Sequence, residues 1–261
     1  MMPRIAIPLP HTLDLEYAGR ALPQYERAVA LAGGEPVRIA PDKSRDEIMA
    51  VMDGCDGILL PGSKADIDPA RFQAARSPHT ATADPARDAL DDLLLQHAYR
   101  QRKPVLGICY GLQSLNVFRE GSLVQHIPDF LPEETRAKVN HEAGRSVAVA
   151  HAVEIEPDSK LAAIVAAEGR SPSRSPSRSP TSEVRRPVII PVNSSHHQSA
   201  AAIGVGLRIV AHCPDDGIIE ALEGTASDHF VLAVQWHPER SVEQDAPSAA
   251  IFKALVNAAK Q

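Results

Sequence analysis

Residues 104–121 read PVLGICYGLQSLNVFREG and contain a strand pattern followed directly by a helix pattern. The apolar run at 105–108 is typical of a short strand that is buried on both faces of a parallel sheet. Apolar residues then recur at helical spacing over 112–117. This order predicts a strand-to-helix junction with Cys109 at its centre.

Cys109 lies between Gly107 and Gly111 in the pattern G-x-C-x-G. Glycine permits a sharp turn and the close approach of neighbouring backbone. The pattern is the cysteine counterpart of the G-x-S-x-G nucleophile elbow. A thiol at a helix N-terminus has a lowered pKa, because the partial positive charge there stabilises the thiolate. We therefore predict a reactive Cys109 with a stabilised thiolate; the alternative is a small buried core residue.

Composition narrows the class of partner. The net charge is −6 at pH 7, and charged residues of both signs are mixed along the chain. Such a chain has no basic surface for nucleic acid, so we expect a small-molecule substrate and no nucleic-acid partner. The three cysteines never form C-x-x-C, which argues against a disulfide framework or a zinc knuckle.

The same features predict the cellular setting. The N-terminus lacks the apolar core of a signal peptide, and no apolar run is long enough to span a membrane. We expect a cytoplasmic protein with no membrane partner and a single domain over residues 1–261. A homodimer is compatible with this expectation.

Strands and helices alternate around the 104–121 stretch. Apolar runs predict further strands at 4–8, 36–40, 57–60, 188–192 and 230–236. Periodicity and capping residues predict helices at 13–32, 44–52, 85–102, 161–167 and 247–259. This alternation favours a parallel sheet wrapped by helices, with ligands beyond the carboxyl ends of the strands. The stretches 146–156 and 207–223 predict an added antiparallel part.

Two segments interrupt the alternation. Residues 63–83 form a long polar loop, and a backbone N–H at the preceding Gly62 could act as an oxyanion donor above Cys109. An ordinary turn is the alternative. The repeat SPSRSPSRSP at 171–180 has nothing to bury, so it predicts a disordered insert over 169–186 that acts as a spacer. Serine phosphorylation or partner docking is the less favoured role.

A cysteine nucleophile needs a base and a group that orients the base. His237 and Glu239 directly follow the strand predicted at 230–236. Strand ends of a parallel sheet present catalytic groups, so we predict His237 as the base and Glu239 as its orienting partner.

The pair His196-His197 offers a rival base or a metal site. No third ligand stands at a helpful spacing, and neighbouring side chains on an extended segment point in opposite directions. We therefore predict no metal site here and favour contact with a polar substrate. The alternative is a hydrogen-bonded turn.

Taken together, five motifs resemble those of class I glutamine amidotransferase-like proteins, and most of all the gamma-glutamyl-gamma-aminobutyrate hydrolases of peptidase family C26. The motifs are LPGS at 60–63, RD at 87–88, PVLGICYGLQSLNV at 104–117, VNSSHHQ at 192–198 and VQWHPE at 234–239. The resemblance covers nearly the whole chain. It implies a flavodoxin-like three-layer α/β sandwich, with a mostly parallel central sheet, helices on both faces and a small antiparallel portion.

The resemblance also implies roles for individual residues. Cys109 would be the nucleophile, His237 the base and Glu239 its orienter, while the amides of Gly62 and Tyr110 would form the oxyanion hole. The residues implied in holding the glutamyl headgroup are Gln113, Ser195, His196 and His197. The implied chemistry passes through a γ-glutamyl thioester and uses no metal or organic cofactor.

The chain departs from the hydrolases at two points. They commonly have Arg after the nucleophile and Gly-Gly after the elbow helix, whereas this chain has Tyr110 and Glu120-Gly121. Tyr after the cysteine is familiar in amidotransferase domains that supply ammonia to a synthetase. The resemblance as a whole implies hydrolysis of γ-glutamyl amines, and Tyr110 leaves a glutaminase subunit as the alternative. A catalytically silent regulatory protein is the third reading, against which the intact Cys, His and Glu argue.

Overall fold

The computed structural model describes residues 1–168 and 186–260. The predicted insert at 169–186, including the repeat at 171–180, lies outside the described residues except for Arg186.

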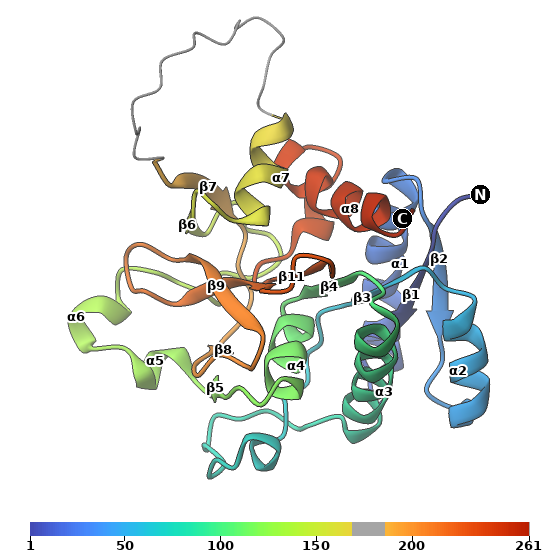
Figure 1. Cartoon of the computed structure of the whole chain (residues 1–261). Coiled ribbons are helices and arrows are strands. Elements are labelled where there is room, and N and C mark those ends of the chain that lie inside the picture. Colours follow the sequence, from blue (N-terminus) through green and yellow to red (C-terminus); the bar gives the residue numbers. More distant parts are fainter. Residues whose placement is uncertain (169–185, 261) are drawn as a thin grey trace, which may run out of the picture.

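Within these ranges, nine strands form one mixed sheet (Figure 1). Its order is β2 (Glu35–Ile39), β1 (Arg4–Pro8), β3 (Gly57–Leu60), β4 (Val105–Ile108), β11 (Val231–Val234), β10 (Ile219–Gly224), β9 (Leu207–His212), β6 (His151–Ile155) and β7 (Val188–Val192). The strands from β2 to β11 pair in parallel, and the pairs from β11 to β7 are antiparallel. The α/β class with an added antiparallel part is confirmed.

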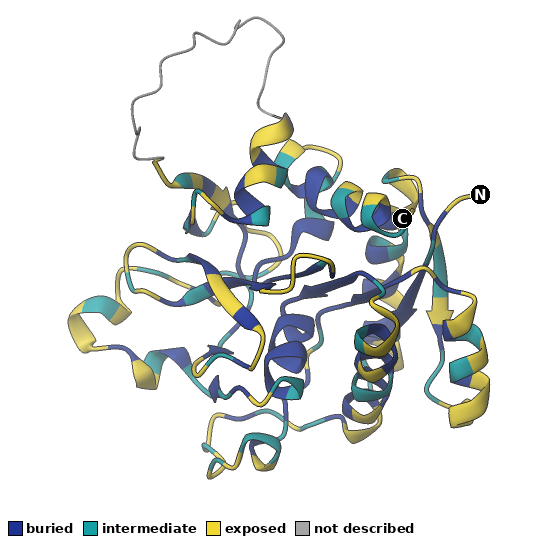
Figure 2. Cartoon of the chain, in the orientation of Figure 1, coloured by how far each residue is buried: buried dark blue, intermediate teal, exposed yellow. Residues whose placement is uncertain are grey.

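Helices cover both faces of the sheet. One face packs α1 (Leu15–Leu31), α7 (Lys160–Glu168) and α8 (Ala246–Ala258), and the other packs α2 (Arg45–Asp53), α3 (Pro85–Gln101) and α4 (Tyr110–Phe118). Alternation along β1 explains this division, because Ile5 and Ile7 join the first core and Ala6 joins the second. Figure 2 shows the central strands β3, β4 and β11 buried between the two helical layers, whereas β2 and β9 are partly exposed. No helix in the described ranges is long and apolar enough to cross a bilayer.

Local signals located most of these elements correctly. The capping box predicted from Ser44 and Glu47 is present at the start of α2, and the Asp84 side chain caps α3. The strand expected over 146–156 is shorter and begins at His151.

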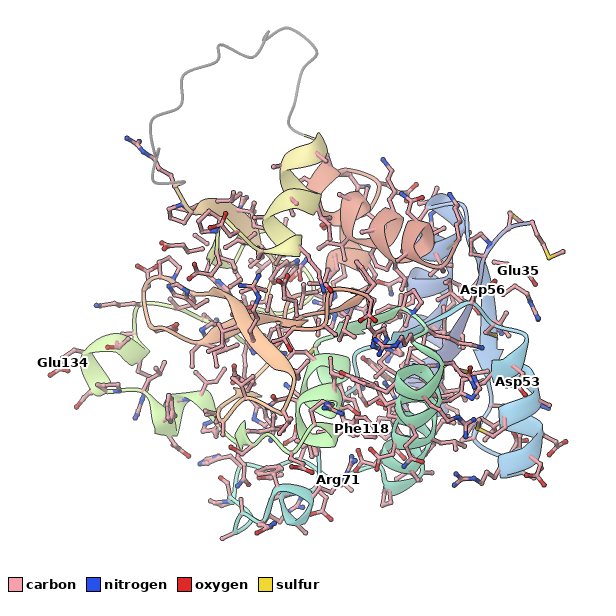
Figure 3. All side chains as sticks on the ribbon, in the orientation of Figure 1. Glu35, Asp53, Asp56, Arg71, Phe118 and Glu134 are labelled. Atoms are coloured by element: carbon pink, nitrogen blue, oxygen red, sulfur yellow. The ribbon has the colours of Figure 1, made fainter. Side chains whose placement is uncertain are left out.

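Several short elements were not expected. The predicted polar loop after β3 contains a 3-10 helix, η1 (Pro69–Phe72). Between α4 and β6 lie α5 (Ile127–Phe130) and α6 (Glu133–Arg136), whose Glu134 marks the outer edge of the molecule in Figure 3. β5 (Leu123–Val124) pairs with β8 (Ser199–Ala200) in a separate two-stranded sheet. Elements of two to four residues are too short to show a periodicity, which is why the sequence did not reveal them.

Candidate active site

Cys109 lies at the turn between β4 and α4, as predicted, with φ 53° and ψ −105°. A positive φ is strained for a residue other than glycine, and such strain is typical of a nucleophile elbow. The turn requires both flanking glycines. A Cβ on Gly107 would lie 2.7 Å from the Gly111 carbonyl oxygen, and a Cβ on Gly111 would clash with the Leu60 carbonyl.

The parallel pairing of β11 with β4 brings His237 to the same edge of the sheet as Cys109. Val234, near the end of β11, is in register with Ile108, the last residue of β4. His237 Nδ1 lies 2.8 Å from Glu239 Oε1, and both side chains are buried. Because a carboxylate only accepts hydrogen bonds, the proton of the neutral ring resides on Nδ1. The lone pair is then on Nε2, as a general base requires.

Asn193 holds the backbone of His237 from both sides. Its Oδ1 accepts a hydrogen bond from His237 N at 3.0 Å, and its Nδ2 donates to His237 O at 2.9 Å. In the sequence, Asn193 stands out only as a member of the motif VNSSHHQ at 192–198. Its position directly after β7 was the available signal, but its partner is 44 residues away in the chain.

A pocket of about 410 Å³ opens over Cys109 and His237. Its other lining residues are Tyr17, Ser63, Lys64, Ala65, Asp66, Gln113, Arg145, Ser195, His196, His197, Gln198 and Arg240. Three of them, Lys64, Arg145 and Arg240, are cationic. Sequence reasoning did not single out any of these three, because isolated basic residues carry no pattern. The pocket therefore suits a substrate with negatively charged groups.

Gln113 and Ser195, both implied as substrate contacts, lie at this pocket. The buried Gln113 donates from Nε2 to the Gln198 carbonyl at 3.3 Å. Ser195 Oγ accepts a hydrogen bond from Arg240 Nη1 at 2.8 Å. Both side chains are thus held in place by protein partners at the pocket wall.

The side chains of His196 and His197 point in opposite directions, as predicted for neighbours on an extended segment. His197 Nε2 lies 3.0 Å from Asp66 Oδ1, and this hydrogen bond raises the pKa of His197. His196 instead directs its ring nitrogens to the Gln198 carbonyl and toward Glu220. The expectation that His196 hydrogen bonds to substrate is therefore not supported by the ring's orientation. The sequence argued against a metal because no third ligand stands near His196 in the chain. The fold brings Glu220 to His196 from a distant strand, so that argument is weakened.

The two amides expected to form the oxyanion hole both lie beside Cys109. Burial raises the pKa of the Cys109 thiol overall, and the hydrogen bond from the Tyr110 N–H to the sulfur opposes this shift. The Gly62 N–H donates to the Tyr25 hydroxyl at 3.1 Å, so a substrate oxygen would have to replace that hydroxyl. A Cβ on Gly62 would lie 2.9 Å from His237 Cε1, which shows how closely this turn approaches the ring.

The protonation state of the pair differs from the predicted stabilised thiolate. Burial raises the pKa of the Cys109 thiol to about 12, although Arg240 opposes the shift. Burial also lowers the pKa of His237, against the effect of Glu239. Desolvation disfavours both charged forms and outweighs Arg240 and the Tyr110 N–H, which lower the thiol pKa. Both shifts favour a neutral thiol and a neutral imidazole in the resting site, against the predicted thiolate.

Alkylation of Cys109 by iodoacetamide is accordingly expected to be slow at neutral pH and to rise about tenfold per pH unit through pH 9, because only the thiolate reacts. Mass spectrometry of the Cys109 peptide across this pH range measures the rate. The chain unfolded in urea is the control, since its thiols titrate near about 8.5. A rate that already levels off near neutral pH would instead indicate a Cys109–His237 ion pair.

A buried arginine supports the turn that carries Gly62. Arg87 of α3 is fully buried and donates from Nη2 to the Pro61 carbonyl at 2.8 Å. Its Nη1 donates to the Leu9 and Pro10 carbonyls, and its Nε pairs with Asp91 at 2.7 Å. One guanidinium thus connects the ends of β1 and β3 to α3.

Replacing Arg87 with Met is expected to lower the free energy of unfolding by about 3–5 kcal/mol, because it leaves the buried Asp91 carboxylate without its cation. Denaturant unfolding measures this change. Arg27→Met is the matched control, since Arg27 makes a solvent-exposed pair with Glu243 and its loss should change the free energy of unfolding far less. Equal losses in the two variants would contradict the proposed connection.

The side chain of Tyr110 points toward α3. Its hydroxyl donates to Asp88, and its ring lies 5.0 Å from the Arg87 guanidinium. Arg71, labelled in Figure 3, reaches the same Asp88 at 2.9 Å. The Tyr110 side chain therefore packs between α3 and α4, and it does not line the pocket over Cys109.

Comparison with known proteins agrees with this architecture. The family model described as Peptidase C26 matches residues 11–239. A "Putative glutamine amidotransferase" of Mycobacterium tuberculosis is 35% identical over 243 residues, which are 93% of this chain and 68% of that protein. Gamma-glutamyl-gamma-aminobutyrate hydrolase PuuD of Escherichia coli is 30% identical over 239 residues, 90% of this chain and 84% of that protein.

Among solved structures, the glutaminase domain of Trypanosoma brucei CTPS, with bound acivicin, matches with a TM-score of 0.58 at 18% identity. The match covers 99% of this chain and 94% of that one. The fold is thus that of class I glutamine amidotransferases. The family match and the hydrolase relatives show that the chain is an enzyme of the hydrolase and amidotransferase-like class. Within that class it belongs to the peptidase C26 family.

Proposed function

We propose that this enzyme hydrolyses the γ-glutamyl amide bond of γ-glutamyl amines such as γ-glutamyl-aminobutyrate. Cys109 is the nucleophile, His237 the general base and Glu239 its orienting partner. The observation that carries the proposal is the 2.8 Å contact between His237 Nδ1 and Glu239 Oε1 at the pocket that also exposes the Cys109 elbow.

The neutral resting pair implies how the reaction starts. His237 Nε2 takes the Cys109 proton as the sulfur attacks the γ-carbonyl, because a free thiolate is not stable in this buried position. The Gly62 and Tyr110 amides then hold the oxyanion, and such preorganised donors contribute roughly 3–4 kcal/mol each. His237 gives its proton to the departing amine. Water deprotonated by the same imidazole clears the γ-glutamyl thioester.

The charges of the pocket support a γ-glutamyl substrate. Its α-carboxylate suits Arg240, which Ser195 already holds at the pocket wall, or the neighbouring Arg145. Its α-ammonium suits the Asp66 carboxylate beside His197. An aminobutyrate leaving group adds a second carboxylate, for which Lys64 is the remaining cation of the pocket.

A glutaminase that supplies ammonia to a synthetase is the second candidate. It is favoured by the name of the Mycobacterium tuberculosis relative, a putative glutamine amidotransferase, and by the glutaminase domain that shares the fold. The pocket volume argues for the hydrolase, because about 410 Å³ leaves room for an amine substituent beyond the γ-glutamyl group.

Steady-state kinetics on γ-glutamyl-aminobutyrate, a γ-glutamyl dipeptide and glutamine separate the two candidates. We expect the isolated protein to turn over the γ-glutamyl amine faster than glutamine and without a partner. Activity against glutamine alone, and only after a synthetase is added, would support the glutaminase. The Cys109→Ala variant serves as the blank for both substrates.

We also propose that the protein acts on a small-molecule γ-glutamyl substrate, is cytoplasmic and forms a homodimer. The three cysteines are free and buried, which agrees with a reducing compartment.

A further inference from the structure

Four buried side chains from four separate segments converge behind the catalytic pocket. They are His141 in the loop after α6, His151 at the start of β6, His196 in the loop after β7, and Glu220 on β10. His141 Nδ1, His151 Nε2 and His196 Nε2 lie 3.3, 3.5 and 3.6 Å from Glu220 Oε1. All four ligand atoms lie within 4.8 Å of one another.

None of these converging atoms has a hydrogen-bond partner, and neither oxygen of Glu220 has one. The Glu220 side chain is fully buried. Burying an ionised carboxylate is unfavourable unless a positive charge or hydrogen-bond donors compensate it. A positive charge at the centre of the cluster would supply this compensation.

The other nitrogen of each ring fixes the tautomer. His141 Nε2 lies 2.8 Å from the Asp216 carboxylate. His151 Nδ1 lies 3.0 Å from the Ala152 carbonyl, and His196 Nδ1 lies 3.0 Å from the Gln198 carbonyl. These oxygens can only accept, so each outer nitrogen carries the proton of a neutral ring. The three inner nitrogens consequently direct lone pairs at one carboxylate. Metal-binding histidines are commonly held by outer hydrogen bonds of this kind.

Against the effect of burial, the Asp216 and Glu220 carboxylates raise the pKa of His141 to about 9, but a single proton satisfies only part of this arrangement. One proton shared between a ring nitrogen and Glu220 leaves two further lone pairs facing the carboxylate. A divalent cation at the centre would be bound by all four groups at once. A tetrahedral zinc ion with bonds of about 2.0–2.1 Å separates its ligand atoms by about 3.3 Å. The observed nitrogen-to-oxygen distances of 3.3–3.6 Å are close to this value.

We propose that His141, His151, His196 and Glu220 form a binding site for a divalent transition metal. Three imidazole nitrogens and one carboxylate oxygen make zinc the best match among such metals. The site uses four protein ligands and is buried, so its role is structural. It is separate from the proposed cysteine chemistry and does not depend on it.

The position of the site indicates what the metal stabilises. His196 precedes His197 and follows Ser195, and all three line the pocket over Cys109. Binding would connect this loop to β6, to β10 and to the loop that carries His141. Loss of the metal is expected to loosen the substrate-binding wall, raising KM more than it lowers kcat.

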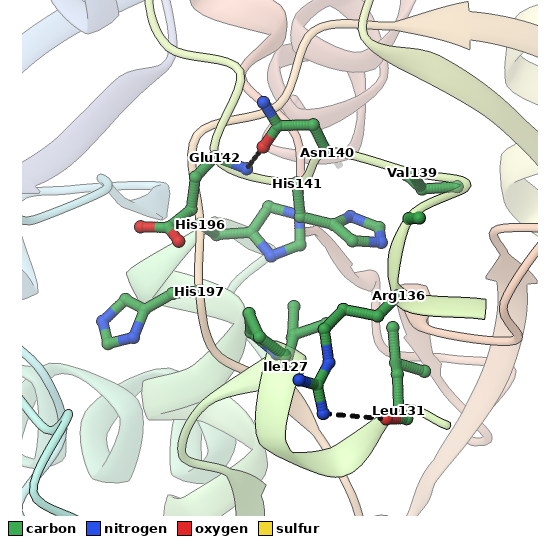
Figure 4. A pocket seen from close by; sticks show the side chains of 11 residues that line it. Ile127, Leu131, Arg136, Val139, Asn140, His141, Glu142, His196 and His197 are labelled. Atoms are coloured by element: carbon green, nitrogen blue, oxygen red, sulfur yellow. Dashed lines mark hydrogen bonds between the residues drawn. The ribbon is translucent and has the colours of Figure 1, made fainter. Parts of the chain in front are cut away.

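An adjacent pocket of about 210 Å³ offers a route for the ion. His141 and His196 line it together with residues from the segment 127–142 (Figure 4). In Figure 4 the rings of His141 and His196 lie close together, while His197 is turned to the other side. The ring centroids of His141 and His196 are 4.9 Å apart.

A second grouping of His141 with Cys213 and Asp216 lies next to this site. Both Asp216 oxygens already have partners, because Oδ2 contacts His141 Nε2 and Oδ1 accepts from Ile218 N. Asp216 thus serves as an outer partner that orients His141, and Cys213 is not needed for binding. This difference can be tested with separate variants.

The test is the zinc content of the full chain, purified after expression in zinc-supplemented medium. We expect about one zinc ion per chain in the wild type and in Cys213→Ala, and almost none in His151→Ala and Glu220→Gln. His97→Gln is the matched control, because His97 is a buried histidine of α3 outside the cluster. Asp216→Asn should weaken zinc affinity about 10–100-fold. Loss of zinc in Cys213→Ala, or its retention in Glu220→Gln, would overturn the assignment.

A second measurement uses the wild type alone, since a ligand variant can fail to fold. The protein is stripped with a chelator and titrated with Zn²⁺ or Co²⁺. We expect the Tm to rise until one equivalent is bound, and the Co²⁺ form to show the visible absorption of a tetrahedral site that excess Zn²⁺ removes. No metal in the purified protein, together with no response of Tm or absorption, would refute the site. Neither readout requires the enzyme to be active.

Discussion

Replacing Cys109 with Ala should abolish turnover of γ-glutamyl amines while leaving the protein folded. The change removes the sulfur that would form the thioester, and no other cysteine lines the pocket within the described residues. In a serine protease triad, removal of the nucleophile lowers kcat by about 10⁶-fold, and we expect a loss of this order here. Steady-state and single-turnover kinetics measure the loss, and thermal melting checks the fold.

Cys55→Ala is the matched control for this variant. Cys55 is also buried, but it packs in the core formed with α2 and α3. We expect it to reduce stability with kcat within a few-fold of the wild type. Without the nucleophile, substrate binding and the oxyanion hole alone should support less than about one per cent of the wild-type kcat. A higher kcat in Cys109→Ala would show that the nucleophile is wrongly assigned.

The second large effect is expected for His237→Ala, which should lower the acylation rate by about 10⁴–10⁶-fold. The neutral Cys109 thiol cannot attack without losing its proton, so the reaction depends on the base more strongly than it would with a preformed thiolate. Glu239→Gln should cost about 10⁴-fold, because an amide in place of the carboxylate can donate to Nδ1 and favour the wrong tautomer. Stopped-flow measurement of thioester formation gives both values.

Two histidine variants test whether this loss is specific. His229→Gln changes a buried histidine that contacts the Lys103 carbonyl, remote from the pocket, and should leave acylation unchanged. His197→Ala should mainly raise KM, because it removes the partner of Asp66 at the pocket wall. Should His197→Ala abolish acylation while His237→Ala does not, the roles of the two histidines are reversed.

Local patterns were sufficient to predict much of the fold. The strand at 105–108, the turn at Cys109 and the helix after it depend on apolar spacing and on two glycines within five residues. The capping box at Ser44 likewise involves neighbours three residues apart. Such signals act over one or two turns of backbone, so a sequence displays them directly. The sequence also singled out the residues of the proposed triad, because Cys109 and His237 each follow a recognisable apolar strand and Glu239 lies two residues after His237.

The features that were missed depend on residues far apart in the chain. Asn193 reaches the His237 backbone, and Arg87 reaches Pro61, only because neighbouring strands and helices bring them together. The cluster around Glu220 draws its ligands from four segments, so no single spacing reveals it. The thiol pKa depends on how completely packing removes water from Cys109. Local sequence therefore determined which elements form and which side chains follow them. The contacts of the Glu220 cluster, the positioning of His237 and Pro61, and the protonation of Cys109 depend instead on three-dimensional proximity and on desolvation.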